Sequence, residues 1–97
     1  NPFVMRAGLA LLKKLNSSIY TTLKETTQEY VTIFKEKFQE DIIFKDSLFW
    51  INCSTERFQE IFTYCFNKGI YLSPHVAEVN FLSLSHKEAI KDFKNLL

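Results

Sequence analysis

The stretch Asp41–Gly69, DIIFKDSLFWINCSTERFQEIFTYCFNKG, decides the fold. It opens with two short apolar runs, Asp41–Lys45 and Ser47–Cys53, whose β-branched and aromatic residues predict two strands. The polar residues where the runs meet suit a tight turn, so we expect an antiparallel hairpin. Because side chains alternate along a strand, the second run should place two pairs on opposite faces. These pairs are Leu48 with Trp50, and Phe49 with Ile51.

The second half of the same stretch predicts an amphipathic helix. Ser54 or Thr55 would cap its start, and Gly69 would end it in the left-handed conformation that glycine adopts easily. Between these limits, apolar residues recur with the spacing of one helix face. They are Phe58, Ile61, Phe62, Cys65 and Phe66.

Helices and short strands continue on both sides of this stretch. Helices are predicted over Pro2–Leu15 and Ser18–Phe38, and strands over Ile70–Ser73 and Val79–Leu84. A last helix should follow a capping box. This order lacks strict βαβ alternation, so it predicts an α+β fold with a small, mostly antiparallel sheet and helices packed on one face. The 97 residues should form a single domain, 1–97.

Two of these helices have a predicted apolar side. In the helix over Ser18–Phe38 that side comprises Ile19, Leu23, Tyr30, Phe34 and Phe38, whereas Thr26 and Thr27 fall mostly elsewhere. In the last helix, Ser85 and Glu88 would form the capping box, with Ala89, Ile90, Phe93 and Leu97 inward.

Composition narrows the class of protein. Twelve Lys and Arg against eleven Asp and Glu give a net charge of +1, without the basic face that nucleic-acid binding needs. No signal peptide or membrane-spanning apolar run is evident, so we expect a cytoplasmic protein. Cys53 and Cys65 are too far from each other and from the histidines for zinc, and free thiols are expected. Ten Phe, four Tyr and one Trp leave two interpretations open: a Phe-rich core, or apolar surface that faces another domain or subunit.

Few residues suggest chemistry by themselves. Only two glycines are present, so no glycine-rich phosphate loop is possible, and no nucleophile elbow or HExxH motif occurs. His75 is expected in an exposed loop and His86 beside a helix start. Glu78 is an isolated carboxylate within Gly69–Ser85. It is either the exposed end of a strand or a group placed at a site, and the residues alone favour the exposed position.

Two motifs at the ends of the chain resemble a known family. The segment Gly69–His86, GIYLSPHVAEVNFLSLSH, resembles G-V-Y-L-A-P-S-x-F-E-A-G-F-V-S-x-A-H, typical of the C-terminal part of glutamate-1-semialdehyde aminomutases. The identical positions are Gly69, Tyr71, Leu72, Pro74, Glu78, Phe81, Ser83 and His86. The start, NPFVMRAGLALL, resembles the family's N-P-L-A-M-A-A-G-L-A-T-L helix, so the resemblance covers the whole chain.

The resemblance implies that the chain is the C-terminal small domain of a class III, fold-type-I pyridoxal-phosphate enzyme. Such an enzyme is a dimeric isomerase that converts glutamate-1-semialdehyde to 5-aminolevulinate in porphyrin biosynthesis, with pyridoxal or pyridoxamine phosphate as cofactor. The Schiff-base lysine would lie in the large domain, upstream of Asn1. The first residue, which is not Met, also suggests a fragment. The fragment alone should therefore hold no catalytic, cofactor-binding or metal-binding residue and be inactive.

The resemblance assigns one site residue, Glu78, as a substrate-binding carboxylate, which reverses the interpretation from the residues alone. His75, Ala77 and Asn80 depart from the family pattern, as does Arg6 in the first helix. These departures leave open whether the parent is an aminomutase or a related aminotransferase. The alternative is an independent, non-catalytic α+β module for interaction or ligand binding.

Overall fold

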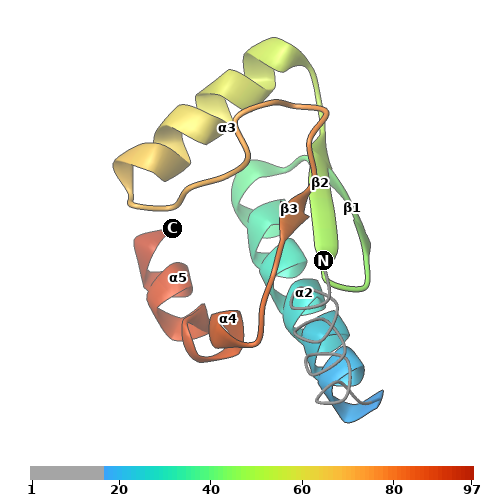
Figure 1. The fold of residues 1–97 in the computed structure, drawn as a ribbon. Coiled ribbons are helices and arrows are strands. Elements are labelled where there is room, and N and C mark those ends of the chain that lie inside the picture. Colours follow the sequence, from blue (N-terminus) through green and yellow to red (C-terminus); the bar gives the residue numbers. More distant parts are fainter. Residues whose placement is uncertain (1–16) are drawn as a thin grey trace, which may run out of the picture.

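The computed structural model describes residues 17–97 and has the predicted α+β fold (Figure 1). The predicted helix over Pro2–Leu15 lies outside the described residues. The elements are α2 (Ser17–Phe38), β1 (Asp41–Lys45), β2 (Leu48–Asn52), α3 (Thr55–Asn67), β3 (Asn80–Phe81), α4 (Ser85–Glu88) and α5 (Ile90–Leu96).

The sheet is antiparallel, and its three strands lie in the order β1-β2-β3. The predicted hairpin is confirmed: β1 pairs with β2 over their whole length, with Ile42 opposite Ile51. Asp46 in the connecting turn has a φ of 54°, the left-handed conformation that Asp tolerates better than most residues. β3 pairs with β2 through only two positions, Leu48 with Phe81 and Phe49 with Asn80.

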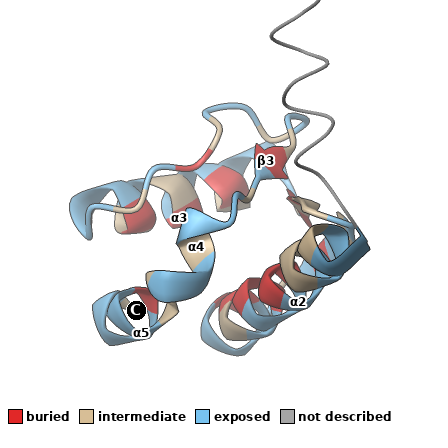
Figure 2. Ribbon diagram, turned by 60° about the horizontal axis from the view of Figure 1, so that its bottom comes forward, coloured by how far each residue is buried: buried red, intermediate tan, exposed pale blue. Residues whose placement is uncertain are grey.

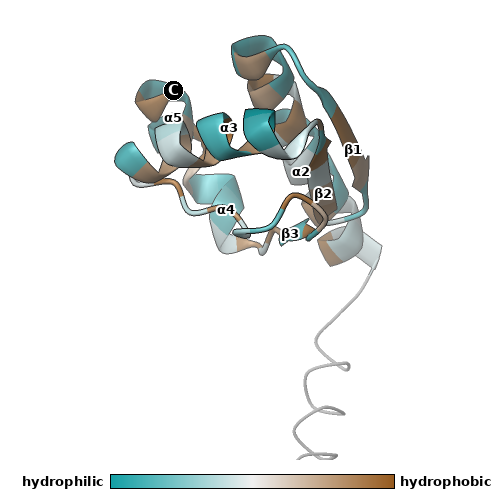
Figure 3. Ribbon diagram, turned by 90° about the horizontal axis from the view of Figure 1, so that it is seen from above, coloured by the Kyte–Doolittle hydropathy of each residue, from teal (hydrophilic) through white to brown (hydrophobic). Residues whose placement is uncertain are grey.

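The two faces of the sheet differ as the alternation predicts. On one face Ile42, Phe49 and Ile51 are buried. On the other, Ile43 and Trp50 oppose each other and remain partly exposed, although both are apolar. Figure 3 shows hydrophobic residues along both strands of the hairpin. The second face, called the open face below, therefore carries apolar side chains that the described residues do not cover.

Helix α2 lies against the buried face of the sheet, and its predicted stripe is confirmed at Tyr30, Phe34 and Phe38. Thr26 and Thr27 correct the prediction, because both are buried rather than outside the stripe. Their hydroxyls donate to the backbone carbonyls four residues earlier, at 2.8 Å in both cases. A hydroxyl that is hydrogen-bonded within its own helix can be buried without an unpaired polar group.

Helix α3 has the predicted caps. The Ser54 hydroxyl accepts a hydrogen bond from the Arg57 backbone N–H at 3.1 Å. At the other end Gly69 has a φ of +81°, its N–H donates to the Phe66 carbonyl, and the Ile70 N–H donates to the Cys65 carbonyl. This pair of hydrogen bonds is the Schellman motif, which satisfies the last carbonyls of a helix. Glycine is needed here because other residues adopt this φ at a cost.

The Arg57 side chain links the start of α3 to the end of α2 by hydrogen bonds and ion pairs. Its Nε lies 2.8 Å from a Glu40 carboxylate oxygen, one terminal nitrogen lies 3.0 Å from Glu60, and the other donates to the Phe38 carbonyl at 2.9 Å. The guanidinium therefore serves three acceptors, one of them a carbonyl left without a partner where α2 ends.

One predicted strand does not form, and another is shorter than predicted. Within residues 17–97, Ile70–Ser73 forms no strand, because the Ile70 N–H donates to the α3 cap and the Ser73 N–H donates to the Asn80 side chain. The strand predicted over Val79–Leu84 shrinks to β3. The N–H groups of Ile70 and Ser73 already have acceptors, at a helix end and on a side chain, so they are not available for hydrogen bonds to another strand.

The capping box predicted at Ser85 and Glu88 is also wrong. The α4 N-cap is Leu84, which makes no side-chain cap bond. A reciprocal contact forms two residues earlier, where the Ser83 N–H donates to His86 Nδ1 at 2.9 Å and the His86 N–H donates to the Ser83 carbonyl at 3.1 Å. His86 thus takes the role that Glu or Gln has in a capping box.

The C-terminal helix is two short helices, α4 and α5, joined at Ala89. Of the residues predicted to point inward, Phe93 is buried and Ala89, Ile90 and Leu97 are partly buried.

The core joins the buried face of the sheet to α2, α3 and α5. Figure 2 shows the buried residues on the inner sides of α2 and α3. Phe34 is only 2% exposed, and its ring centroid lies 5.1 to 5.8 Å from those of Phe38, Phe49 and Phe93. One side chain therefore contacts the end of α2, the central strand and the last helix.

Replacing Phe34 with alanine should destabilise the chain by about 3–5 kcal/mol, because a large buried ring is lost and a cavity remains. Phe66→Ala is the matched control, since Phe66 lies on α3 and is 55% exposed. Urea denaturation of both variants measures the difference in the free energy of unfolding. Equal losses in the two variants would contradict a core centred on Phe34.

Candidate functional site

Glu78, the predicted site residue, lies in the loop that joins the Ile70–Ser73 segment to β3. Its side chain is exposed, and its backbone N–H donates to the His75 carbonyl at 3.0 Å. Within residues 17–97 the carboxylate makes no hydrogen bond or ion pair. It is therefore free to bind an amine or another hydrogen-bond donor from outside this part of the chain.

The loop that carries Glu78 is closed by Ser73 and Asn80. The Asn80 side chain accepts from the Ser73 N–H at 2.8 Å and donates to the Phe49 carbonyl at 3.5 Å. The Ser73 hydroxyl donates to the Val79 carbonyl at 2.9 Å. Asn80 is 8% exposed, so this polar side chain is buried with its partners. Asn80 therefore joins one end of the loop to the central strand, and Ser73 joins the other end to Asn80 and Val79.

His75 stabilises the turn inside this loop. Its ring Nδ1 accepts from the Ala77 N–H at 3.1 Å, and the side chain is exposed. The prediction of an exposed loop histidine is confirmed, with a hydrogen bond that the sequence did not show.

An apolar hollow of about 470 Å³ lies beside the Glu78 loop. It is lined by Trp50, Ile51, Asn52, Cys53, Val76, Ala77 and Val79. Three of these residues, Val76, Ala77 and Val79, belong to the loop that carries Glu78, so the hollow adjoins this loop.

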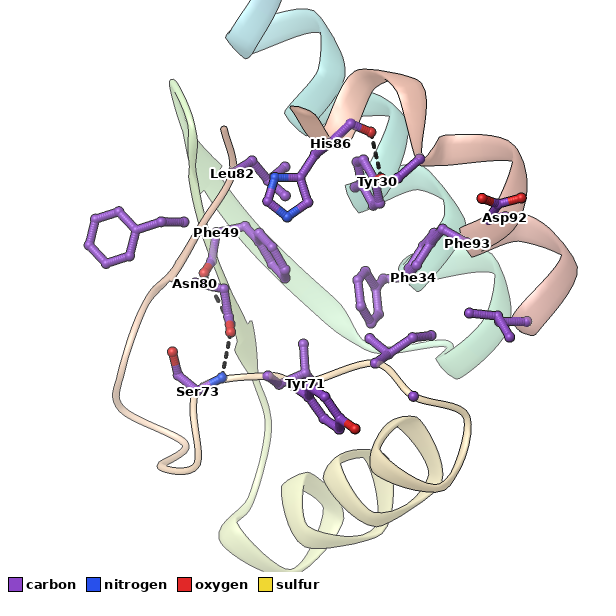
Figure 4. Close-up of a pocket in the computed structure, with 16 residues that line it drawn as sticks. Tyr30, Phe34, Phe49, Tyr71, Ser73, Asn80, Leu82, His86, Asp92 and Phe93 are labelled. Atoms are coloured by element: carbon purple, nitrogen blue, oxygen red, sulfur yellow. Dashed lines mark hydrogen bonds between the residues drawn. The ribbon is translucent and has the colours of Figure 1, made fainter. Parts of the chain in front are cut away.

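A second hollow, of about 590 Å³, lies between α2, α5, the central strand and the Ile70–Ser73 segment (Figure 4). We call it the aromatic cleft. Its walls include Tyr30, Phe34, Phe49, Leu72, Leu82 and Phe93, with His86, Ala89 and Asp92 from the C-terminal helices.

Tyr30 and His86 join two walls of the aromatic cleft. The Tyr30 hydroxyl donates to the His86 backbone carbonyl at 2.6 Å, and the two rings meet edge to face with centroids 6.0 Å apart. Burial, with smaller effects from Glu29 and Asp92, raises the pKa of Tyr30 above its ordinary value. The phenol therefore stays protonated and donating at neutral pH. Figure 4 shows the His86 imidazole directed into the cleft toward Phe49.

The two cysteines are free, as predicted. Cys65 is fully buried, and this burial raises the pKa of its thiol to about 11. Cys53 is half-buried, and burial followed by the nearby Glu40 charge raises the pKa of its thiol as well. Both thiols are protonated at neutral pH and are poor nucleophiles and poor metal ligands. In the described part of the chain no group of three or more His, Cys, Asp or Glu side chains could hold a metal.

The buried Cys65 predicts a loss of stability in alkali. The unfolded thiol loses its proton near 9.0 and the folded one near 11, so the folded chain binds more protons between these values. The contribution of the protonated Cys65 thiol to the free energy of unfolding is therefore complete below pH 9 and is lost as the pH rises toward 11. Urea denaturation should show a steeper fall over this range in the wild type than in Cys65→Ala. Parallel pH profiles would contradict this assignment.

Sequence reasoning missed the residues that position the site. The Ser73–Asn80 contact joins residues seven positions apart, which no local pattern predicts. The one signal in the sequence was Asn80 at a position where the family pattern has glycine. The Tyr30 contact with His86 spans 56 positions and has no local pattern.

Comparison with known proteins confirms the resemblance. The chain is 36% identical to the glutamate-1-semialdehyde 2,1-aminomutase of Leptospira interrogans and 31% identical to that of Bdellovibrio bacteriovorus, in each case over 93% of its own length. It is 27% identical to the corresponding protein of Thermoplasma volcanium. The chain spans about a quarter of the length of these curated relatives, 25% to 26%, and matches a C-terminal small domain.

No protein-family model matches the chain, and no solved structure does. No helix within residues 17–97 has the length and apolar character needed to cross a membrane.

Proposed function

We propose, from the match to glutamate-1-semialdehyde 2,1-aminomutases, that this chain is the C-terminal small domain of a pyridoxal-phosphate enzyme. The parent would convert glutamate-1-semialdehyde to 5-aminolevulinate, and the chain over 1–97 would be a single domain that is inactive alone. The observation that carries the proposal is identity of up to 36% along 93% of the chain.

The cofactor would be held by another part of the parent. A Schiff base needs a lysine inside a pocket, and every lysine among the described residues is exposed. The loops of this part of the chain also offer no glycine-rich cradle for a phosphate. The described residues therefore do not fit pyridoxal phosphate, and the role proposed for them is to shape the substrate pocket.

Glu78 would be the contribution of this domain to that pocket. Its carboxylate has no partner among the described residues, and the Ser73–Asn80 contact fixes the loop that presents it. A carboxylate held in this way can accept charge-assisted hydrogen bonds from the amino group of a substrate, which orients the substrate without reacting with it. It also matches the glutamate of the family pattern.

The open face would be the contact with the large domain of the parent. Trp50 and Ile43 on the hairpin, and the 69% exposed Phe81 on β3, give this face an apolar character unusual for free surface. It adjoins the Glu78 loop, so covering it would bring Glu78 toward the partner domain. We further propose a homodimeric, cytoplasmic parent, in keeping with the free cysteines.

Adding pyridoxal phosphate to the purified chain should give no saturable Schiff-base absorption band and no 5-aminolevulinate. The physical reason is the absence of a pocketed lysine in the described residues. Absorption titration with a matched lysine-free peptide as baseline measures this. A stoichiometric band that maps to one lysine would contradict the proposal and favour an independent ligand-binding module.

In the full-length parent, Glu78→Gln should lower kcat/KM by roughly 10- to 100-fold, the effect of losing one hydrogen bond to a charged group. Glu25→Gln is the matched control, since Glu25 is an exposed carboxylate on α2. Steady-state assays of 5-aminolevulinate formation distinguish the two. Full activity of Glu78→Gln would return Glu78 to an exposed loop residue without a role.

A further inference from the structure

The aromatic cleft has the size and lining of a small-molecule site, and the proposed function does not use it. Its volume of about 590 Å³ lies within the range of pockets that hold small ligands, roughly 300–1,000 Å³. Phe34, Phe49 and Phe93 are each 7% exposed or less, and all three rings line it. Aromatic side chains in such a hollow offer a packing surface for an apolar ring.

One hydrogen-bond donor points into this apolar space. His86 Nδ1 accepts from the Ser83 N–H at 2.9 Å, and a backbone N–H can only donate. The proton of the neutral imidazole therefore lies on Nε2. Within residues 17–97, Nε2 has no hydrogen-bond partner, and the ring is directed into the cleft (Figure 4). The tautomer is thus set by the backbone, and the free donor faces the cleft.

The Tyr71 ring packs on Phe66 of α3, and Figure 4 shows its hydroxyl directed away from His86. The remaining polar side chains of the cleft are already hydrogen-bonded or disfavour anions. The Tyr30 hydroxyl is held by the His86 carbonyl, and the Asn80 amide is held by Ser73 and Phe49. Asp92 is the one formally charged side chain among the described residues that line the cleft. A carboxylate ligand would approach an uncompensated negative charge in an apolar setting, which is unfavourable.

We propose that the aromatic cleft binds an uncharged, planar aromatic molecule of one or two fused rings that carries one hydrogen-bond acceptor. The rings pack among Phe34, Phe49 and Phe93, and the acceptor receives the proton of His86 Nε2. The cleft borders the Glu78 loop at Ser73 and Asn80, but Glu78 does not line it, and the proposal does not depend on the proposed enzyme function.

Three probes of nearly equal shape test the proposal on the full chain: quinoline, naphthalene and 2-naphthoate. Quinoline has a ring nitrogen that accepts a hydrogen bond, naphthalene lacks an acceptor, and 2-naphthoate is an anion. Titrations followed by amide chemical shifts should show saturable changes confined to the cleft. Quinoline should bind roughly three- to tenfold more tightly than naphthalene, the effect of one hydrogen bond. The 2-naphthoate anion should bind most weakly.

Two variants locate the site. His86→Leu leaves an apolar side chain of similar size without any hydrogen-bond donor, and the exposed Ser83 N–H can then donate to water. Quinoline should then bind no better than naphthalene, whose affinity stays unchanged. Ala89→Phe should abolish the binding of both, because the new ring fills the cleft, while Ala77→Phe on the exposed loop should abolish neither. A melting-temperature measurement confirms that each variant is folded, and Ala89→Leu replaces Ala89→Phe if the latter unfolds.

The proposal is overturned by any of three results. They are the absence of saturable shifts, shifts that map to the open face instead of the cleft, and an equal loss of quinoline and naphthalene affinity in His86→Leu.

Discussion

The packing of the Phe34 ring is the interaction on which the rest of the structure depends. The hairpin, α2 and α5 come from three separate regions of the chain, and each places an aromatic ring within 6 Å of Phe34. The sheet is a hairpin to which β3 adds only two paired positions, and a hairpin alone is at best marginally stable, so it needs a helix against its apolar face. Phe34 provides this support and connects the C-terminal helices to the same core.

Satisfied backbone groups explain how irregular segments lie between these elements. The Schellman motif at Gly69 ends α3, the Ser73–Asn80 contact closes the next loop, and His86 caps the following turn. In each case a side chain or a tight turn provides the hydrogen-bond partner that a neighbouring strand would provide in a sheet. The Glu78 loop and the Ile70–Ser73 segment therefore have hydrogen-bonded backbone groups at their ends, although neither is regular secondary structure.

Local patterns in the sequence were enough to predict the hairpin, α3 with both caps, and the α+β class. They failed where other nearby groups accepted hydrogen bonds from the same backbone donors. Ile70–Ser73 has the composition of a strand, but its donors are taken by a helix end and by Asn80. Ser85 and Glu88 fit the capping-box pattern, but the contact at this helix start forms between Ser83 and His86, where the Ser83 N–H donates to the His86 ring. Glu78 was predicted from a family pattern alone, and the contacts that position it could not be read from spacing.

The Tyr30–His86 hydrogen bond has a consequence for the order of folding. It joins residues 56 positions apart, whereas the hairpin and α3 close over short distances in sequence. Long closures cost more chain entropy and form after local ones. The segment after β3 should therefore dock last and detach first, so that hydrogen exchange in α4 and α5 reports partial opening of the domain while the hairpin stays closed.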